Sequence, residues 1–264
     1  MQKNIVMGVD VGASGVKGGL VNVKEGKMIT ERHRIETPKP ATPKAMANVF
    51  AELVQYYKWT GPVGCGFPAI VHHGVARSAA NIDRSWIGVN IERIFGQAIG
   101  APVYALNDAD AAGLATMRHG IGKGEAGTVI MLTIGSGLGS ALFIDGELVP
   151  NSEFGHVYLK GQKEVAERYA SNNARKYYNL EWDDWGKRFN EYLHHLDRLL
   201  SPDLVILGGG ASKSFDLYEK QLDVPYAVRP AALQNRAGTV GAAMYALERE
   251  KKAKKKKEKS EKKK

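Results

Sequence analysis

Residues 10–17 read DVGASGVK and follow directly on the apolar run IVMGV at residues 5–9. The apolar run has the length of a buried strand, and the glycines behind it permit a tight turn because they lack a Cβ. Further strands are expected at residues 19–23 and, where the sequence alternates loosely, at residues 27–36. The chain is therefore predicted to open with an antiparallel meander rather than with a strand–helix crossover.

The same pattern returns in the middle of the chain. The apolar run TVIMLTI at residues 128–134 leads into GSGLGS at residues 135–140, and residues 141–144 supply the hairpin partner. A third glycine turn, at residues 208–210, follows the apolar run at 204–207. Two strand–turn–strand halves predict two related lobes.

The segments between these strands carry further helix and strand signals. Thr42 can cap a helix that has Pro43 at its first position and apolar residues at helical spacing up to Tyr57. Two more strands are expected at residues 63–67 and 103–106. The remaining helices are predicted at residues 91–99, 109–119, 164–178, 182–200 and 239–250.

The net charge of +9 is concentrated at the end of the chain. Residues 251–264 hold ten lysines and two glutamates, so the other 250 residues carry only +1. We expect the lysine run to be a disordered, solvated tail, with anion binding as the alternative. Cys65 is the only cysteine, and no stretch approaches 18 uninterrupted apolar residues. The expectation is a soluble, cytoplasmic protein with no signal peptide and no membrane partner.

Three glycine turns placed after buried strands point to phosphate chemistry. A polyanion needs backbone N–H groups that it can approach closely, and glycine allows such an approach. One turn alone is weak evidence, because a β-hairpin needs glycine too. No G-x-x-x-x-G-K-[ST] sequence occurs, and residues 8–19 lead into a strand rather than a helix. A Walker A loop and a dinucleotide fingerprint are therefore excluded.

On these motifs the chain resembles the superfamily of sugar kinases, heat-shock chaperones and actin. Residues 10–17 resemble its first phosphate motif, residues 133–140 its second, and residues 208–210 its adenosine-side turn. Within that superfamily, EFGH at residues 153–156 and ERYAS at residues 167–171 resemble signatures of the ROK family (repressors, open reading frames and kinases).

This resemblance implies a fold and its division into lobes. The expected class is α/β, a two-lobed actin-like ATPase (ribonuclease H-like) sugar-kinase fold with a cleft between the lobes. Residues 1–108 and 238–250 would form the lobe with the first phosphate motif and a catalytic aspartate at the hinge. Residues 109–237 would hold the second phosphate motif, the sugar-binding residues and the adenosine-side turn, ahead of the disordered tail at 251–264.

The sequence departs from the family pattern in two features, which concern zinc binding and DNA binding. Many ROK proteins hold a structural zinc through a histidine and three cysteines, but the cysteine positions here fall on Tyr158, Lys160 and Val165. No thiolate is available at those positions, so no zinc site is expected, and His156 is predicted to serve sugar binding or structure. The chain starts directly on its first strand, so a DNA-binding domain and a DNA partner are not expected.

One subgroup of the family matches more closely. Residues 201–213 and 233–243 are similar to the corresponding stretches of ROK kinases that use inorganic polyphosphate on glucose. The resemblance implies an enzyme that phosphorylates glucose, or mannose, at O6 with polyphosphate and also with ATP. A strictly ATP-dependent ROK hexokinase for glucose, mannose or an N-acetylated sugar is one alternative. A non-catalytic sugar-sensing protein is another, and the presence of Asp10, Lys17 and Asp108 argues against it.

The resemblance also assigns roles on the sugar side. Asp108 is the expected general base, since an Asn–Asp pair holds the catalytic position in ROK sugar kinases. Without that context, an aspartate before a helix predicts an N-cap. Hexose hydroxyls need carboxylates, amides and imidazoles as partners. The residues expected to supply them are Asn81, Asn107, Asp108, Glu153, His156 and Glu167.

Metal and phosphate contacts are implied in the same way. Asp10 should orient Mg²⁺ through water, because Mg²⁺ keeps several waters and uses few protein carboxylates. Asp110 is an alternative carboxylate that we expect to face solvent or to cap its helix. The donor-side turn would consist of Gly208, Gly209 and Gly210. Phosphate oxygens are expected at Asp10, Gly12, Ser14, Gly15, Lys17, Thr133, Gly135, Ser136, Gly137 and Gly139. A homodimer is expected, as is common among ROK kinases.

Overall fold

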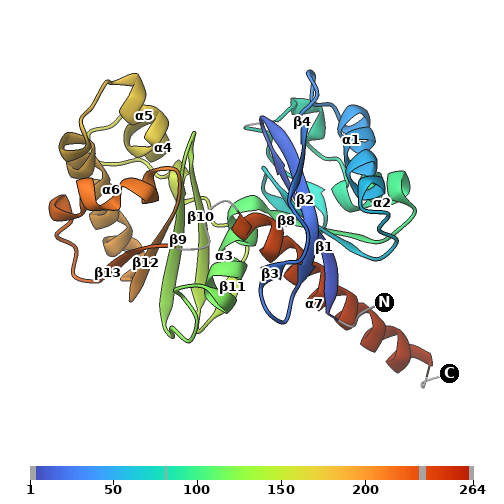
Figure 1. Ribbon diagram of the computed structural model, residues 1–264. Coiled ribbons are helices and arrows are strands. Elements are labelled where there is room, and N and C mark those ends of the chain that lie inside the picture. Colours follow the sequence, from blue (N-terminus) through green and yellow to red (C-terminus); the bar gives the residue numbers. More distant parts are fainter. Residues whose placement is uncertain (1–3, 81, 232–235, 262–264) are drawn as a thin grey trace. The chain divides into compact units, whose positions relative to one another are not determined.

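The computed structural model describes residues 4–80, 82–231 and 236–261. The chain divides into two compact units, which are described one at a time (Figure 1). The first unit comprises Met1–Ala115 and Arg236–Lys264, and the second comprises Thr116–Asn235.

The first boundary between the units follows Ala115, inside helix α3 (Asp108–His119), and so lies seven residues beyond the boundary after residue 108 that the sequence predicted. The start of α3 belongs to the first unit because it packs against helix α7 (Ala237–Glu261). A Cβ on Gly241 of α7 would collide with the carbonyl oxygen of Ala111. Such a close approach of two helix backbones requires glycine at the contact.

A six-stranded sheet forms the centre of the first unit, in the order β3-β2-β1-β5-β8 with β4 paired to β2. Strands β1 and β2 are antiparallel and are joined by a two-residue turn, while β1, β5 and β8 are parallel. The expected meander is therefore confirmed. The strands are β1 (Ile5–Gly12), β2 (Gly15–Asn22), β3 (Lys27–Met28), β4 (His33–Glu36), β5 (Val63–Phe67) and β8 (Val103–Asn107).

One prediction for this sheet is wrong in detail. Residues 27–36 were expected to form one strand, but they form β3 and β4, which pair with opposite ends of β2. Between them, the Leu20 N–H donates to the Thr30 side-chain oxygen at 3.0 Å instead of to a backbone carbonyl. This side-chain bond interrupts the backbone ladder, and two short strands result.

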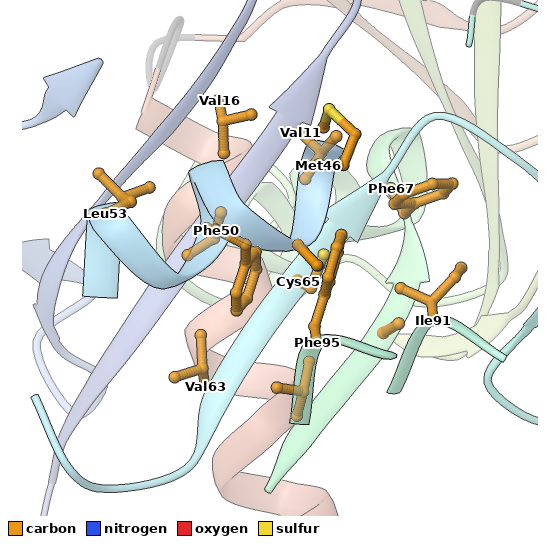
Figure 2. Close-up of a cluster of buried hydrophobic side chains, with 14 of the residues drawn as sticks. Val11, Val16, Met46, Phe50, Leu53, Val63, Cys65, Phe67, Ile91 and Phe95 are labelled. Atoms are coloured by element: carbon orange, nitrogen blue, oxygen red, sulfur yellow. The ribbon is translucent and has the colours of Figure 1, made fainter. Parts of the chain in front are cut away.

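Two helices cover one face of this sheet with a buried apolar core. Helix α1 (Pro43–Tyr56) begins as predicted, with Pro43 at its start and the Thr42 hydroxyl accepting from the Ala45 N–H at 3.4 Å. Helix α2 (Ile91–Ile99) lies beside it, and Figure 2 shows Phe50 and Phe95 from the two helices in the core. Their rings stack at 4.2 Å between centroids. Cys65 lies in this core as a buried thiol.

A short hairpin, β6 (Val71–His72) and β7 (Val75–Ala76), and a 3-10 turn η1 (Arg84–Trp86) precede α2.

Helix α7 packs against the same sheet through glycines. Because side chains alternate along a strand, Gly8 of β1 and Gly64 of β5 face away from the α1–α2 core. A Cβ on Gly8 would collide with the Thr239 carbonyl oxygen, and one on Gly64 with the Ala242 carbonyl oxygen. Small residues therefore let the helix backbone lie directly on the strands.

A five-stranded sheet with the order β11-β10-β9-β12-β13 forms the centre of the second unit. Strands β9 and β10 are an antiparallel hairpin, and β12 runs parallel to β9. This repeats the order β2-β1-β5 of the first unit, as the two glycine-rich halves predict. The strands are β9 (Thr128–Ile134), β10 (Leu138–Ile144), β11 (Glu147–Val149), β12 (Leu204–Gly209) and β13 (Ala227–Pro230).

The helices of the second unit include one correction. Residues 164–178 were expected to form a single helix, but the chain breaks at Ser171, which is extended with ψ of 164°. The Ser171 hydroxyl accepts from the Ala174 N–H at 3.1 Å and so starts a second helix. Helix α6 has the predicted bounds. The elements are α4 (Ala166–Ala170), α5 (Asn172–Tyr177), α6 (Trp182–Leu200), and the 3-10 turns η2 (Phe154–His156), η3 (Ala211–Leu217) and η4 (Glu219–Gln221).

The lysine run also differs from its expectation. Residues 251–261 continue α7 as a helix, with residues 251–260 exposed, instead of forming a disordered tail. Lysine, glutamate and alanine are good helix formers, and no glycine or proline interrupts them. The helix is already started against the sheet, so its extension needs no new nucleation. None of the helices in the described part of the chain combines the length and hydrophobicity that a bilayer crossing requires.

Candidate active site

The ends of three parallel strands bring two carboxylates of the first unit to one edge of its sheet. Asp10 of β1 pairs with Gly66 of β5, and Phe67 pairs with Asn107 at the end of β8. Asp108 follows as the first residue of α3, and its Cα lies 3.6 Å from the Cβ position on Gly66. Asp10 and Asp108 are therefore neighbours across a single glycine of the sheet.

Asn107, rather than Asp108, provides the main cap of helix α3. Its Oδ1 accepts from the Ala109 N–H at 2.8 Å and from the Asp110 N–H at 3.1 Å, and its Nδ2 donates to the Ala69 carbonyl at 3.1 Å. Asn107 is 7% exposed, so its side chain is largely committed to the protein. Asp108 is more exposed, and its Oδ1 accepts from the Ala109 N–H at 2.9 Å. This bond orients the carboxylate that the sequence identifies as the general base.

Asp110 does not face solvent, contrary to expectation. It is fully buried on the first turn of α3. The helix brings the following residue, Ala111, against α7, so this side of α3 belongs to the interior of the first unit. This burial distinguishes Asp110 from Asp10, to which the sequence offered it as an alternative carboxylate and which is partly exposed.

The first glycine turn carries cations close to Asp10. Lys17 of β2 pairs directly with Asp10 of β1, and its ammonium nitrogen lies 3.8 Å from the Cβ position on Gly12. Burial raises the pKa of Asp10, and the charges of Lys17 and Arg32 oppose that rise. The Gly12 carbonyl accepts from the Thr37 hydroxyl at 2.6 Å, which ties the turn to the end of β4. The predicted residues Asp10, Gly12, Ser14, Gly15 and Lys17 are thus gathered at one hairpin.

Sequence analysis did not single out Arg34. This residue of β4 pairs with Lys17, and its Nη2 donates to the Ser14 carbonyl at 2.5 Å. A Cβ on Gly15 would come 2.5 Å from the Arg34 Nε, so glycine is needed where the guanidinium crosses the turn. The sequence did place this arginine in a segment expected to form a strand. Residue spacing alone, however, does not predict which residue of β2 it pairs with, and this pairing brings it to the turn.

The second glycine turn, in the second unit, has a carboxylate beside it. The Gly135 N–H donates a hydrogen bond to the Gly137 carbonyl at 2.9 Å, and the Gly135 carbonyl accepts one from the Asn173 N–H at 3.2 Å. The Glu167 Oε2 accepts from the Leu138 N–H at 3.0 Å. A Cβ on Gly137 would collide with that carboxylate. The predicted residues Thr133, Gly135, Ser136, Gly137 and Gly139 lie on or next to this turn.

Three of the predicted sugar-binding residues form one group in the second unit. The Glu153 Oε2 lies 3.3 Å from the His156 Nδ1. Burial raises the pKa of Glu153, which the His156 charge opposes and the neighbouring Glu167 reinforces. The chain can bend tightly between Glu153 and His156 because Gly155 packs where a Cβ would collide with the Leu138 carbonyl oxygen. Carboxylates and an imidazole in this arrangement can accept and donate hydrogen bonds to sugar hydroxyls.

His156 is exposed and pairs with a carboxylate rather than lying satisfied in the core. Tyr158, which occupies one of the family's cysteine positions, is also exposed. The expectation that the chain holds no zinc stays a prediction, for elemental analysis to test. Asn81, the sixth predicted sugar-binding residue, lies outside the described residues.

The third glycine turn lies at the end of strand β12. Gly209 has φ of +80°, a conformation that favours glycine, and a Cβ there would come 2.5 Å from the Ile134 carbonyl oxygen. The Ser212 hydroxyl donates to the Gly209 carbonyl at 2.8 Å. Gly210 comes near α5, since its Cβ position is 3.8 Å from the Asn172 Nδ2.

A cavity of about 270 Å³ adjoins the second glycine turn. Of its lining residues, the sequence predicted only Ser136 and Glu167. Helices α4 and α5 supply most of the others, because the break at Ser171 turns the chain there. The cavity is lined by Ser136, Glu164, Glu167, Arg168, Ser171, Asn173, Ala174, Tyr177 and Tyr178.

The repeated hairpin-plus-parallel-strand units and the glycine turns at their strand ends define an actin-like (ribonuclease H-like) sugar-kinase fold, and solved structures share it. The ROK family glucokinase from Streptomyces griseus, in complex with glucose and AMPPNP, matches with a TM-score of 0.80 and 24% identity over 92% of this chain and 99% of that one. The predicted fold class is therefore confirmed.

The model of the ROK family matches residues 6–175, and this chain belongs to the ROK family. It is 47% identical, over 90% of its length and 89% of the relative's, to a Mycobacterium tuberculosis protein named polyphosphate glucokinase. The solved inorganic polyphosphate/ATP-glucomannokinase from Arthrobacter sp. strain KM matches with a TM-score of 0.87 and 44% identity, over 92% of this chain and 99% of that one.

Proposed function

We propose that this chain is a kinase that transfers the terminal phosphoryl group of inorganic polyphosphate to O6 of glucose. The observation that carries the proposal is the 47% identity, over 90% of the chain, to a relative named polyphosphate glucokinase. The strand-end carboxylates and the cationic turn of the first unit support it, because they are the groups that phosphoryl transfer requires.

Asp108 would act as the general base. The Ala109 N–H orients its carboxylate at 2.9 Å, and its position after the last parallel strand leaves it partly exposed. As O6 attacks, its proton passes to Asp108 and a new O6–phosphorus bond forms. The bond from that phosphorus to the next bridging oxygen breaks, and the polymer leaves one phosphate shorter. Positioning and charge supply most of the acceleration in such reactions.

Glu153, His156 and Glu167 would hold the sugar. Their carboxylate oxygens accept from hydroxyl groups, and the imidazole both donates and accepts, so the group can distinguish a hexose by its pattern of hydroxyls. Glu167 is fixed by the Leu138 N–H, and Glu153 is paired with His156, which reduces the freedom lost on binding.

The carboxylate of Asp10 fits Mg²⁺. A Cβ on Gly238 would come 3.3 Å from the Asp10 carboxyl carbon, so glycine leaves space around this carboxylate, and Asp10 remains partly exposed. Mg²⁺ takes oxygen ligands and retains water, which suits a single carboxylate. We propose that Asp10 holds Mg²⁺ through water. The ion would neutralise charge on the phosphoryl group being transferred.

ATP is proposed as a second donor and mannose as a second acceptor. The related Arthrobacter structure is named a polyphosphate/ATP-glucomannokinase. The turn at Gly208, Gly209 and Gly210, which resembles the family's adenosine-side turn, would lie beside the adenosine, because these glycines allow close approach. We further propose that the protein is cytoplasmic and that it is a homodimer. Light scattering of the purified chain tests the homodimer.

The test of this function is an assay of glucose 6-phosphate formation with polyphosphate and with ATP as separate donors, each with and without Mg²⁺. The expected result is product from polyphosphate in the presence of Mg²⁺, with activity lost on chelation and the fold retained. Product from ATP alone would favour the strictly ATP-dependent alternative. No product from either donor would favour the non-catalytic alternative.

A further inference from the structure

Three charged side chains of the first unit lie in one line across its sheet. Asp10 of β1 pairs with Lys17 of β2, and Lys17 in turn pairs with Arg34 of β4. Residues in register on neighbouring strands point to the same face, and neighbouring strands lie about 4.8 Å apart. The line therefore runs from a carboxylate through an ammonium to a guanidinium, towards the edge of the sheet.

Both cations lie close to the first turn, and Gly15 leaves the space that the guanidinium occupies. A Cβ on Gly12 would reach within 3.8 Å of the Lys17 Nζ, and one on Gly15 would come 2.5 Å from the Arg34 Nε. The guanidinium has five N–H donors, of which the Ser14 carbonyl takes one at 2.5 Å. The Glu36 carboxylate lies 3.9 Å from the Arg34 Nη1, and this largely exposed pair is worth little in water.

The strand that carries Arg34 is held in place at both ends. At its start, the Tyr57 hydroxyl accepts from the His33 N–H at 2.8 Å and lies 2.9 Å from the Gly18 carbonyl of β2. At its end, the Thr37 hydroxyl donates to the Gly12 carbonyl at 2.6 Å. The backbone that carries Arg34 is therefore fixed before any ligand arrives, so only the end of the side chain has to be ordered on binding.

We propose that Arg34 binds the phosphate donor and favours polyphosphate over ATP, an inference that rests on the proposed function. With the transferred phosphoryl group at Asp10, the next phosphates of the chain lie along the line at Lys17 and then at Arg34. Polyphosphate continues as a row of anions and has no adenosine to bury, so its affinity depends on cations beyond the reacting group. A guanidinium makes short, paired hydrogen bonds to phosphate oxygens.

The test compares Arg34→Gln and Arg34→Lys with a matched control, Lys27→Gln, which removes one exposed positive charge from β3 of the same sheet. For Arg34→Gln, we expect the KM for polyphosphate to rise about 10-fold, with a smaller rise for ATP. Arg34→Lys should show a smaller increase, because it keeps the charge but loses the paired geometry. The kcat, the KM for glucose and the melting temperature should match those of the control.

Two results would overturn this inference. One is a KM for polyphosphate in Arg34→Gln equal to that of Lys27→Gln. The other is a fall in kcat with both donors together with a raised KM for glucose, which would mean that Arg34 supports the turn rather than the donor. If the unaltered chain makes no glucose 6-phosphate from polyphosphate, the proposed function fails and the inference with it. The Lys variant keeps the comparison available if the Gln variant does not fold.

Discussion

The two glycine-rich hairpins of this chain are built alike but carry opposite charge. In both units an antiparallel hairpin adjoins a parallel strand, in the orders β2-β1-β5 and β10-β9-β12. Over the first turn lie the cations Lys17 and Arg34. Beside the second lies the carboxylate of Glu167, with Glu153 close enough for the two charges to interact.

This contrast indicates how one hairpin design can serve two ligands. Cations complement a phosphate chain, whereas carboxylates repel phosphate and accept hydrogen bonds from hydroxyl groups. We infer that the first turn mainly binds the donor and that the carboxylates beside the second mainly bind the sugar. The backbone supplies the hairpin, and the side chains that cross the glycines decide what it binds.

The largest expected effect is that of Asp108→Asn in the first unit. An amide cannot accept the O6 proton, so kcat should fall by roughly 10²- to 10⁴-fold. Glucose binding should persist, because Glu153, His156 and Glu167 are unchanged and an amide can still form a hydrogen bond with a sugar hydroxyl. Steady-state kinetics and calorimetric titration with glucose measure the two quantities, with Asp184→Asn as the control because that carboxylate is exposed on α6. Near-normal turnover would mean that another residue is the base.

Replacing one glycine of each turn by alanine tests donor binding and sugar binding separately. Gly137→Ala forces the Glu167 carboxylate away from the Leu138 N–H, and the KM for glucose is expected to rise about 10-fold. Gly15→Ala displaces the end of the Arg34 side chain, which is flexible, so the KM for the donor should rise only a few-fold.

Each of these variants is the control for the other in steady-state kinetics with both substrates varied. A rise in the donor KM for Gly137→Ala that exceeds its rise in the glucose KM would contradict the division of roles. The second turn would then bind phosphate, as its sequence motif predicts.

A smaller effect is expected on stability from Glu153→Gln. Burial raises the pKa of Glu153, so the ionised form destabilises the folded chain; this cost develops as pH rises above the ordinary glutamate pKa and is complete once pH exceeds the raised pKa. Removing the charge should increase Tm by a few degrees at about pH 8 and change it little at about pH 4, where the carboxyl is largely protonated in both states. Thermal unfolding followed by circular dichroism measures this. The control is Glu147→Gln, an exposed carboxylate of β11. An equal Tm shift at both pH values would argue against a buried charge.

The smallest expected effect concerns the lysine helix at residues 251–261. The side chains of residues 251–260 are exposed and would attract a polyanion only through screened charge, with a Debye length of about 8 Å at physiological salt. Truncation after Glu250 should raise the KM for long polyphosphate about two- to three-fold at low salt, and leave tripolyphosphate, glucose and kcat unchanged. An unchanged KM for the long polymer at low salt would leave the helix without a role in donor capture.

Much of the fold could be predicted because its signals are local. Apolar runs closed by glycines predicted the hairpins, and Thr42 with Pro43 predicted the start of α1. Features decided by tertiary contact could not be predicted in this way. The helix breaks at Ser171 because the Ser171 side chain caps a new helix there instead of letting the first one continue. The lysine residues are helical because they extend α7, which already packs against the sheet.

The candidate site shows the same division. Motifs identified Asp10, Lys17 and Asp108, which lie within two residues of a glycine or of a strand end in the sequence. Arg34 was missed because only the register of β4 on β2 brings it over the first turn. Asp110 was misjudged because the packing of α3, and not its sequence position, decides which carboxylate is buried.

The measurement that tests the central claim most directly is ³¹P nuclear magnetic resonance of the purified chain with polyphosphate, Mg²⁺ and glucose. The account predicts that polymer signal is lost as a glucose 6-phosphate signal appears, and that Asp108→Asn leaves both signals unchanged over the same time. Formation of inorganic phosphate without glucose 6-phosphate, or full glucose 6-phosphate formation by Asp108→Asn, would contradict it.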